Sequence, residues 1–381
     1  MRAMRNFICA CGNITFFRNT HCLACERALG YLPDDNRMAA LHQDSQGRLH
    51  ALAGHGSPDR AVRKCRNYTD HDVCNWLIPA EDDNPLCRAC RLNVTIPDLD
   101  KPRHRELWVK LETAKRHMLY SIFQLNLPII DRQEDPEQGL AFRFMADAEA
   151  ESRFTKPIKG QKRVLTGHAN GLITINLAEA DDVARTRMRE AMGERYRTLL
   201  GHFRHEVGHY FWQTLVANTD YLAPFRTLFG DERQDYGKAV KRHYDQGPPK
   251  GWRERFISAY ASMHPWEDWA ESWAHFLHMV DTLETGREFG FVDMRVNVDK
   301  DADFETLMYF WTTLSTGMNA VNRSMGLSDS YPFVLHAPAR EKLRFVHDVI
   351  MAFGEQPLAS MDHLAAADHW PPRSGLMPSG F

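Results

Sequence analysis

The sequence predicts an α+β protein that combines a metal-stabilised, cysteine-rich N-terminal module with a mainly helical metal-binding domain containing a small β-sheet. Three observations support this fold class. All eight cysteines of the 381-residue chain lie between Cys9 and Cys90. Apolar residues recur at spacings of three and four in several later segments, which is the period of an α-helix buried on one face. One such segment carries His205-Glu206-x-x-His209, a pattern typical of a metal site on a helix.

The composition narrows the class of protein further. With 43% hydrophobic and 25% charged residues the chain is globular, and its length fits one large domain with a smaller one. The net charge of -3 provides no basic surface for nucleic acid or anionic lipid, so neither is an expected partner. No apolar run approaches the roughly 20 residues that span a bilayer, and the N-terminus lacks a secretory signal. We expect a cytoplasmic protein, and no feature indicates its oligomeric state.

The cysteines form two groups of four, and each group ends in a Cys-x2-Cys pair. The groups are Cys9, Cys11, Cys22 and Cys25, and Cys65, Cys74, Cys87 and Cys90. In a reducing compartment such pairs favour thiolate ligation of zinc over disulfides. The close spacing of the first two cysteines makes His21 an alternative ligand. We expect two structural four-cysteine zinc sites in a zinc-ribbon or rubredoxin-like module over residues 1–100, folded around metal rather than around an apolar core.

A boundary and a first helix follow the cysteines. Polar residues and a proline between 98 and 103 mark the end of the N-terminal module, and the second domain is expected to span residues 101–370. Apolar residues at helical spacing predict a helix over 106–124. Residues 371–381 contain proline and glycine without periodicity, so they are expected to form a loosely ordered tail.

Two strands and two further helices are predicted in the second domain. The strands cover 140–144 and 172–177, and the second alternates isoleucine with threonine and asparagine, as in a half-buried or edge strand. One helix carries the paired histidines and runs through Leu215. Another begins at Pro265, because proline is favoured in the first turn and acidic residues follow it there.

The paired histidines predict a catalytic metal site. Residues four apart on a helix point to the same side, so His205 and His209 can bind one zinc ion, with Glu206 beside them as general base. A third histidine ligand just after the motif is excluded, since tryptophan and leucine hold those positions. The sequence instead offers Glu267 as the third ligand. Glu271, one turn later, is expected to accept the N–H of a ligating histidine.

These segments resemble a known group of enzymes. The motif in 203–212, the paired glutamates in 258–278 and the strand region 166–176 are similar to gluzincin metallopeptidases. Together with the cysteine-rich N-terminal region, these segments resemble a bacterial family of putative zinc-binding metallopeptidases with an N-terminal zinc ribbon. The resemblance covers residues 7 to about 283. The resemblance implies a zincin fold, a zinc cofactor and a peptide or protein substrate. A glutamate at 271, where known gluzincins often have aspartate, is a departure from the pattern.

The residues suggest how hydrolysis would proceed. Zinc lowers the pKa of a bound water, and Glu206 accepts its proton as the water attacks a carbonyl. The oxyanion needs a further donor, for which Tyr260 and His264 are candidates. In similar enzymes an edge strand binds extended substrate, and the corresponding residues here are Ile173, Thr174, Ile175 and Asn176.

Two alternatives to a peptidase remain open at this level. The chain could be a zinc-ribbon interaction module for protein or nucleic acid with a degenerate hydrolase domain, although the intact Glu206 argues against degeneracy. It could also be a zinc amidase acting on a non-peptide amide. His275 and His278 are expected to lie behind the site or at the surface rather than on the metal.

Overall fold

The computed structural model describes residues 7–53, 58–147, 164, 166–186, 198–293 and 302–354. The predicted tail at 371–381 lies outside these residues. The chain divides into two compact units. Unit 1 contains residues 1–124, 141–164 and 174–185, and unit 2 contains 125–140, 165–173 and 186–381. The predicted α+β class is confirmed, while the predicted division into domains at residue 100 stays a prediction.

The first part of unit 1 is built from short antiparallel strands. A two-stranded sheet pairs β1 (Phe7–Ile8) with β2 (Ile14–Thr15). A second sheet contains five strands in chain order: β3 (Leu29–Leu32), β4 (Arg37–Gln43), β5 (Leu49–Ala51), β6 (Arg60–Lys64) and β7 (Leu77–Pro79). One cluster of its core comprises six small or medium side chains: Leu32, Ala39, Leu41, Ala51, Val62 and Leu77. Unit 1 also buries the large aromatic side chains of Phe17, Tyr31 and Trp76, whose rings contact one another.

The remainder of unit 1 adds helices and a parallel strand pair. After β6 come α1 (Arg66–Thr69) and the 3-10 turn η1 (Cys90–Leu92), and then β8 (Asn93–Thr95) pairs in parallel with β9 (Ala141–Met145). Helix α2 (His104–Gln124) confirms the helix predicted over 106–124. Strand β9 confirms the predicted strand at 140–144, displaced by one residue.

The strand predicted to bind substrate is an interior strand. β11 (Leu172–Asn176) has β10 (Gly167–Ala169) on one side and β9 on the other, and the 3-10 turn η2 (Leu177–Ala180) follows it. The four residues named for substrate pairing, Ile173, Thr174, Ile175 and Asn176, are all buried. Both edges of this strand already have neighbours, so the expectation of an edge strand that adds a substrate strand at 173–176 is wrong.

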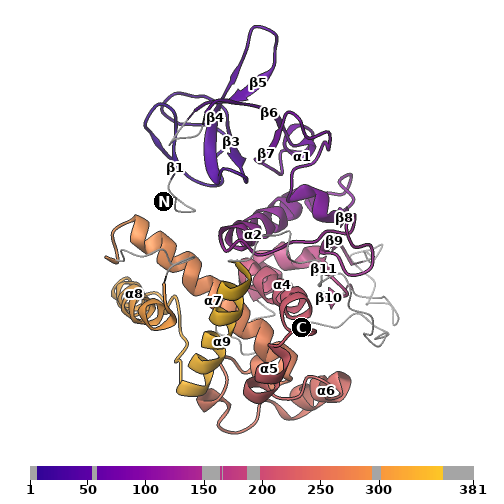
Figure 1. Cartoon of the computed structure of the whole chain (residues 1–381), viewed down its shortest axis with the longest axis vertical. Coiled ribbons are helices and arrows are strands. Elements are labelled where there is room, and N and C mark those ends of the chain that lie inside the picture. Colours follow the sequence, from indigo (N-terminus) through magenta and orange to yellow (C-terminus); the bar gives the residue numbers. More distant parts are fainter. Residues whose placement is uncertain are drawn as a thin grey trace. The chain divides into compact units, whose positions relative to one another are not determined.

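Unit 2 is mainly helical. Its helices are α4 (Leu199–Leu215), α5 (Leu222–Phe229), α6 (Tyr236–Gln246), α7 (Pro265–Glu288), α8 (Phe304–Ser324) and α9 (Ala337–Gly354), with short 3-10 turns η3 (Trp252–Glu254) and η4 (Tyr260–Ser262). The long helix α7 packs against α4, α5, α8 and α9, so it is the centre of the unit (Figure 1). Among the described residues no helix is long and apolar enough to cross a membrane.

Helices α4 and α7 approach closely at a glycine. A Cβ atom on Gly208 would lie 3.1 Å from Cδ1 of Trp273 and 3.2 Å from Cα of Ala270. The indole N–H of Trp269 donates to the Gly208 carbonyl oxygen at 2.8 Å. Trp269 and Trp273 are fully buried, so neither indole ring can move away to make room for a larger side chain at position 208. Position 208 therefore requires glycine for packing.

Buried ion pairs fix α7 to its neighbours on either side of this crossing. The guanidinium of Arg204 on α4 donates to Asp281 at 2.6 Å, and Lys342 on α9 donates to Asp268 at 2.5 Å. All four side chains are at most 7% exposed. A buried charge that loses its partner destabilises a protein by about 3–5 kcal/mol, so these pairs fix the helix register.

We expect Gly208→Val to reduce the free energy of unfolding by about 1–3 kcal/mol, since the added side chain overpacks the crossing. Gly317→Val is the matched control, because Gly317 is also helical and a Cβ there would meet nothing within 4 Å. The control should stay within about 0.5 kcal/mol of the wild type. Urea denaturation measures both changes, and equal effects would show that the crossing is not tightly packed.

Candidate active site

Two histidines and a glutamate converge between α4 and α7. His205, His209 and Glu267 are buried, and one potential ligand atom from each lies within 4.8 Å of the others. Oε2 of Glu267 is 3.0 Å from Nε2 of His205 and 3.6 Å from Nε2 of His209. The two histidines share a face of α4 because they are one helical turn apart. The close crossing then brings the first turn of α7 to that face.

Glu271 orients one of the two histidines. Nδ1 of His205 lies 2.7 Å from Oε1 of Glu271, and the hydroxyl of Ser258 donates to the other oxygen at 2.6 Å. Burial would raise the pKa of Glu271, but its hydrogen bond with His205 and the nearby histidine charge lower it to about 2. The carboxylate therefore accepts the Nδ1–H and leaves Nε2 facing Glu267.

The environment of His205 favours positive charge. Burial alone would lower the pKa of this imidazole, but its hydrogen bonds to Glu267 and Glu271 raise the pKa well above the ordinary value. Burial would raise the pKa of Glu267, yet the charges and hydrogen bonds of His209 and His205 hold it well below the usual range. A metal cation bound between these groups would be stabilised by the negative charges of the two glutamates.

Glu206 lies beside this cluster as a buried anion. Its side chain is fully buried, and neither carboxylate oxygen has a partner with hydrogen-bond geometry among the described residues. Nε2 of His202 is nevertheless 3.2 Å from Oε1. Burial would raise the pKa of Glu206, but His202 and the charges of His205 and His209 lower it to about 2. Apart from these histidines no donor reaches the buried carboxylate among the described residues, so it can accept a hydrogen bond from a bound water.

The composition of the cluster fits zinc. Two imidazole nitrogens and one carboxylate oxygen are the ligand set of several catalytic zinc sites, in which a fourth position is left for water. The Glu206 carboxylate lies 3.2 Å from Nε2 of His202 and close to His205 and His209, where a base for that water must lie. The residues present therefore fit a catalytic zinc.

The structure separates the two residues predicted as oxyanion donors. The ring of Tyr260 lies 5.9 Å from the ring of His205, so it remains beside the site. His264 caps α7 instead: Nδ1 accepts the Trp266 N–H at 3.1 Å, and Nε2 donates to the Gln234 carbonyl at 3.1 Å. Both ring nitrogens are engaged, so the expectation that His264 stabilises an oxyanion is wrong.

Three nearby titratable side chains point to other partners. Asp268 pairs with Lys342, Nδ1 of His275 lies 2.8 Å from the Tyr331 hydroxyl, and Nδ1 of His278 lies 3.3 Å from Arg204. These contacts agree with the expectation that His275 and His278 lie away from the metal.

Sequence reasoning missed two residues at the site. Tyr236, from the first turn of α6, donates its hydroxyl hydrogen to Oε1 of Glu267 at 2.9 Å. His168 on β10 stacks near His209 at a ring distance of 6.0 Å, and its Nε2 accepts the Gly171 N–H at 3.0 Å. No local pattern marks Tyr236, whereas His168 lies in a segment that carried the family resemblance.

The eight cysteines gather in the two predicted groups of four, and in each group the sulfur atoms lie within 4.8 Å of one another. His21 belongs to neither group. The sulfurs are not disulfide-bonded. Three Sγ–Sγ separations are 3.7 Å: Cys9–Cys25, Cys11–Cys22 and Cys74–Cys87. Four sulfurs about 2.3 Å from a tetrahedral zinc are about 3.7–3.8 Å apart, so these distances fit zinc.

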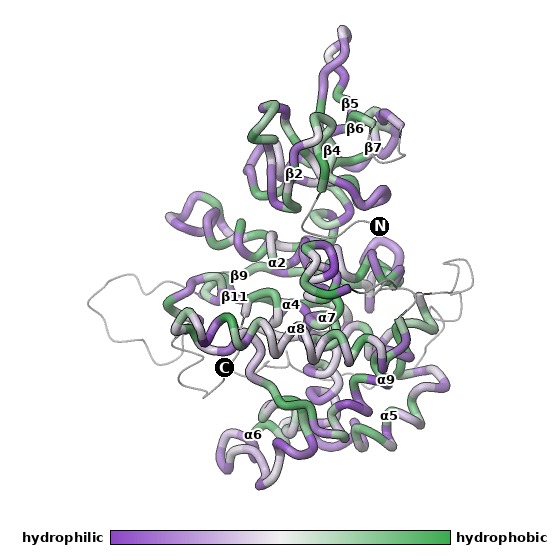
Figure 2. Tube along the Cα trace, turned by 90° about the vertical axis from the view of Figure 1, so that its left-hand side faces the viewer, coloured by the Kyte–Doolittle hydropathy of each residue, from purple (hydrophilic) through white to green (hydrophobic). Residues whose placement is uncertain are grey.

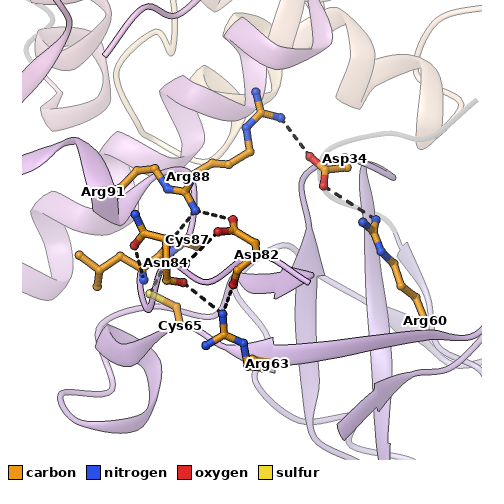
Figure 3. A network of polar contacts seen from close by, with 10 residues as sticks. Asp34, Arg60, Arg63, Cys65, Asp82, Asn84, Cys87, Arg88 and Arg91 are labelled. Atoms are coloured by element: carbon orange, nitrogen blue, oxygen red, sulfur yellow. Dashed lines mark hydrogen bonds and ion pairs between the residues drawn. The ribbon is translucent and has the colours of Figure 1, made fainter. Parts of the chain in front are cut away.

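A polar network supports the loop that leads into the second cysteine group (Figure 3). The carboxylate of Asp82 accepts hydrogen bonds from Arg91 at 2.7 Å and from the Asn84 N–H at 3.0 Å. At the end of the loop the Cys87 N–H donates to Sγ of Cys65 at 3.4 Å. Amide donors of this kind stabilise thiolates. The loop is thereby held in the form that closes the sulfur cluster.

Arg116 on α2 supplies positive charge to the second group. It is buried and donates to the Val73 carbonyl at 2.5 Å. Burial would lower the pKa of Arg116, but the negative charges of Cys74 and Glu112 raise it. A zinc ion bound by four thiolates carries net negative charge, which in a buried site needs a cation nearby. The sequence analysis missed this residue because it lies outside the cysteine module.

Comparison with protein families matches residues 104–349 to a family described as "Putative zinc-binding metallo-peptidase" and residues 6–101 to a zinc-ribbon domain. Uncharacterized proteins of Mycobacterium bovis and of two strains of Mycobacterium tuberculosis are each 42% identical to this chain over 353 residues. These alignments cover 91% of this chain and 95% of each relative. No solved structure matches the chain.

We expect Arg116→Met to accelerate zinc loss from the second cysteine group by about 10-fold or more, since a supporting residue is removed. Lys110→Met is the control, because Lys110 lies on the same helix and makes an exposed ion pair with Asp182 at 2.8 Å. Release of zinc to a chromophoric chelator measures the rates. Equal rates in the two variants would exclude an electrostatic role for Arg116.

Proposed function

This chain belongs to the family of "Putative zinc-binding metallo-peptidase" proteins, and we propose that it hydrolyses peptide bonds at a zinc site with Glu206 as the general base. One observation carries the proposal. The ligand candidates His205, His209 and Glu267 converge near Glu206, a buried and charged carboxylate that lies 3.2 Å from Nε2 of His202. An interaction module with a degenerate hydrolase domain would have no need for this costly arrangement.

The proposal assigns the metals as follows. His205, His209 and Glu267 hold a catalytic zinc in a domain that spans residues 101–370. The two cysteine groups hold structural zinc in the ribbon at residues 1–100, since four thiolates leave no position for substrate. The zinc-ribbon match and the Sγ–Sγ distances of 3.7 Å support the structural sites.

The residues of the site then have separate roles in hydrolysis. When bound, zinc acts as a Lewis acid and lowers the pKa of a water molecule to about 7. Glu206, already charged at neutral pH, takes the proton of the attacking water and returns it to the leaving amine. Glu271 holds His205 in the tautomer that leaves Nε2 free for the metal.

Tyr260 is our candidate for stabilising the oxyanion. Its ring is 5.9 Å from that of His205, and the other candidate, His264, uses both nitrogens at the start of α7. A phenol hydroxyl aimed at the developing charge would strengthen its hydrogen bond in the transition state.

Glu206→Gln should retain the zinc content of the wild type and lose activity by about 10²- to 10⁴-fold, because only general-base assistance is removed. Glu232→Gln is the control, since Glu232 is a buried glutamate of the same unit that pairs with Arg226 at 2.6 Å. Mass spectrometry of a peptide library measures cleavage, and a parallel set of acylated small amines tests for a non-peptide amidase. Full activity of Glu206→Gln would remove it from the mechanism.

Glu267→Ala should abolish zinc binding at the catalytic site while both ribbon sites stay loaded, since it removes one of three ligands. Glu271→Ala should weaken the same site by about 10- to 100-fold without abolishing binding. Asp268→Asn is the control: it alters the adjacent buried carboxylate, which pairs with Lys342 rather than with the histidines. Elemental analysis and chelator competition measure these losses. Retention of the catalytic zinc by Glu267→Ala would contradict the ligand assignment.

A further inference from the structure

We propose that Tyr236 is a positioning residue of the catalytic metal site, where its hydroxyl holds Glu267 with one oxygen turned toward the two histidines. This inference rests on the proposed function, because it takes Glu267 to be a zinc ligand. Nothing in the motif or the family match assigns a role to Tyr236, which lies 31 residues before Glu267 and on a different helix.

The two oxygens of Glu267 have different neighbours. Oε1 accepts the Tyr236 hydroxyl at 2.9 Å, whereas Oε2 lies 3.0 and 3.6 Å from the Nε2 atoms of His205 and His209. A glutamate carboxylate rotates readily about its last bond, since that torsion has a broad profile. A donor on Oε1 restricts the rotation and leaves Oε2 as the oxygen available to a cation shared with the histidines.

The surroundings of Tyr236 hold the hydroxyl in place. The Asp235 side chain caps α6 by accepting the Lys238 N–H at 2.9 Å. The His264 ring lies edge-on to the Tyr236 ring at 5.3 Å and donates to the carbonyl of Gln234 at 3.1 Å. The start of α6 is thus attached to the start of α7, which carries Glu267.

Packing alone does not account for the tyrosine. Helix α6 is largely hydrophilic along its length (Figure 2), and Ala239 is its one buried residue. Tyr236 is only half-buried, yet its hydroxyl reaches a carboxylate that is 1% exposed. Phenylalanine would fill the same space without the hydroxyl. The hydroxyl donates to Glu267 and is also hydrogen-bonded with Tyr260, and a hydrogen bond to a buried charged group is among the stronger ones in proteins.

Loss of this hydroxyl should act on metal binding. Oε1 of Glu267 would lose its donor in a buried position, and the carboxylate could turn both oxygens toward the cation. Removal of residues that orient metal ligands typically weakens binding about 10- to 100-fold. We expect Tyr236→Phe to raise the zinc dissociation constant of the catalytic site within this range while the ribbon sites stay loaded.

The matched control is Tyr210→Phe. Tyr210 lies on α4, is buried, and its hydroxyl accepts the Ile130 N–H at 3.1 Å rather than contacting the metal cluster. Both variants lose one hydrogen-bonded hydroxyl and keep the ring, so any general cost to folding should be similar. Only Tyr236→Phe should change the zinc affinity of the catalytic site.

The experiment uses the full chain with its ribbon zinc retained. The catalytic site is emptied and titrated with zinc against a competing chelator, and cobalt is then added in its place. For Tyr236→Phe we expect weaker zinc binding and a changed visible absorption band of cobalt, because the coordination by Glu267 changes. Far-UV circular dichroism and ribbon zinc content show whether each variant is folded.

The outcomes separate this inference from the proposed function. If Tyr236→Phe keeps both wild-type zinc affinity and the cobalt spectrum, or if Tyr210→Phe loses as much affinity, the positioning role is wrong. If Glu267→Ala also retains the catalytic zinc, the ligand assignment fails as well. Loss of zinc in Glu267→Ala together with unchanged binding in Tyr236→Phe would overturn only the role of Tyr236.

Discussion

The close crossing of α4 and α7 at Gly208 is the constraint on which the rest of unit 2 depends. Gly208 lies between the two histidines of the motif, and its neighbour Ala270 lies between the two glutamates of α7. Because both residues are small, the helix axes approach closely, and side chains one turn to either side meet across the gap. The same contact that packs the core therefore brings the ligand candidates together. A larger residue at this point would separate them as it loosened the core.

The charges around this crossing follow two different rules. Away from the site, Arg204 meets Asp281, and Lys342 meets Asp268, so each buried charge has a partner that fixes helix register. At the site, carboxylates gather around histidines whose deprotonated nitrogens could bind a metal ion, with release of the protons to solvent. Glu206 is fully buried and has a histidine, His202, at 3.2 Å rather than an arginine or a lysine. A buried charge compensated in this way costs stability, and it suits the general-base role that we propose.

The sequence predicts the parts of this site that follow from helical spacing, and it fails where tertiary contacts decide. Two histidines four apart, and two glutamates four apart, each specify one face of one helix. The position of Tyr236 depends on how α6 attaches to α7, for which no spacing rule exists. The strand at 172–176 shows the same limit. Its alternation suggested an edge strand, but the strand is buried and has a neighbouring strand on each side. Both features depend on the whole sheet, which the local pattern does not reveal. The strands β1 to β7 were not predicted because most of them contain only two to five residues.

Unit 1 obtains its rigidity differently from unit 2. Besides a buried aromatic core it has two sulfur clusters, and metal bound at such clusters would contribute folding energy. Yet the second cluster is not self-contained. The negative charges of its cysteines act on Arg116 of α2, a residue beyond the 6–101 match to the zinc-ribbon family. A four-thiolate zinc buried without that cation would carry uncompensated negative charge, and Arg116 without the cluster would be a buried cation paired mainly with Glu112. Cluster and helix thus stabilise each other, and metal loss should loosen α2 together with the ribbon.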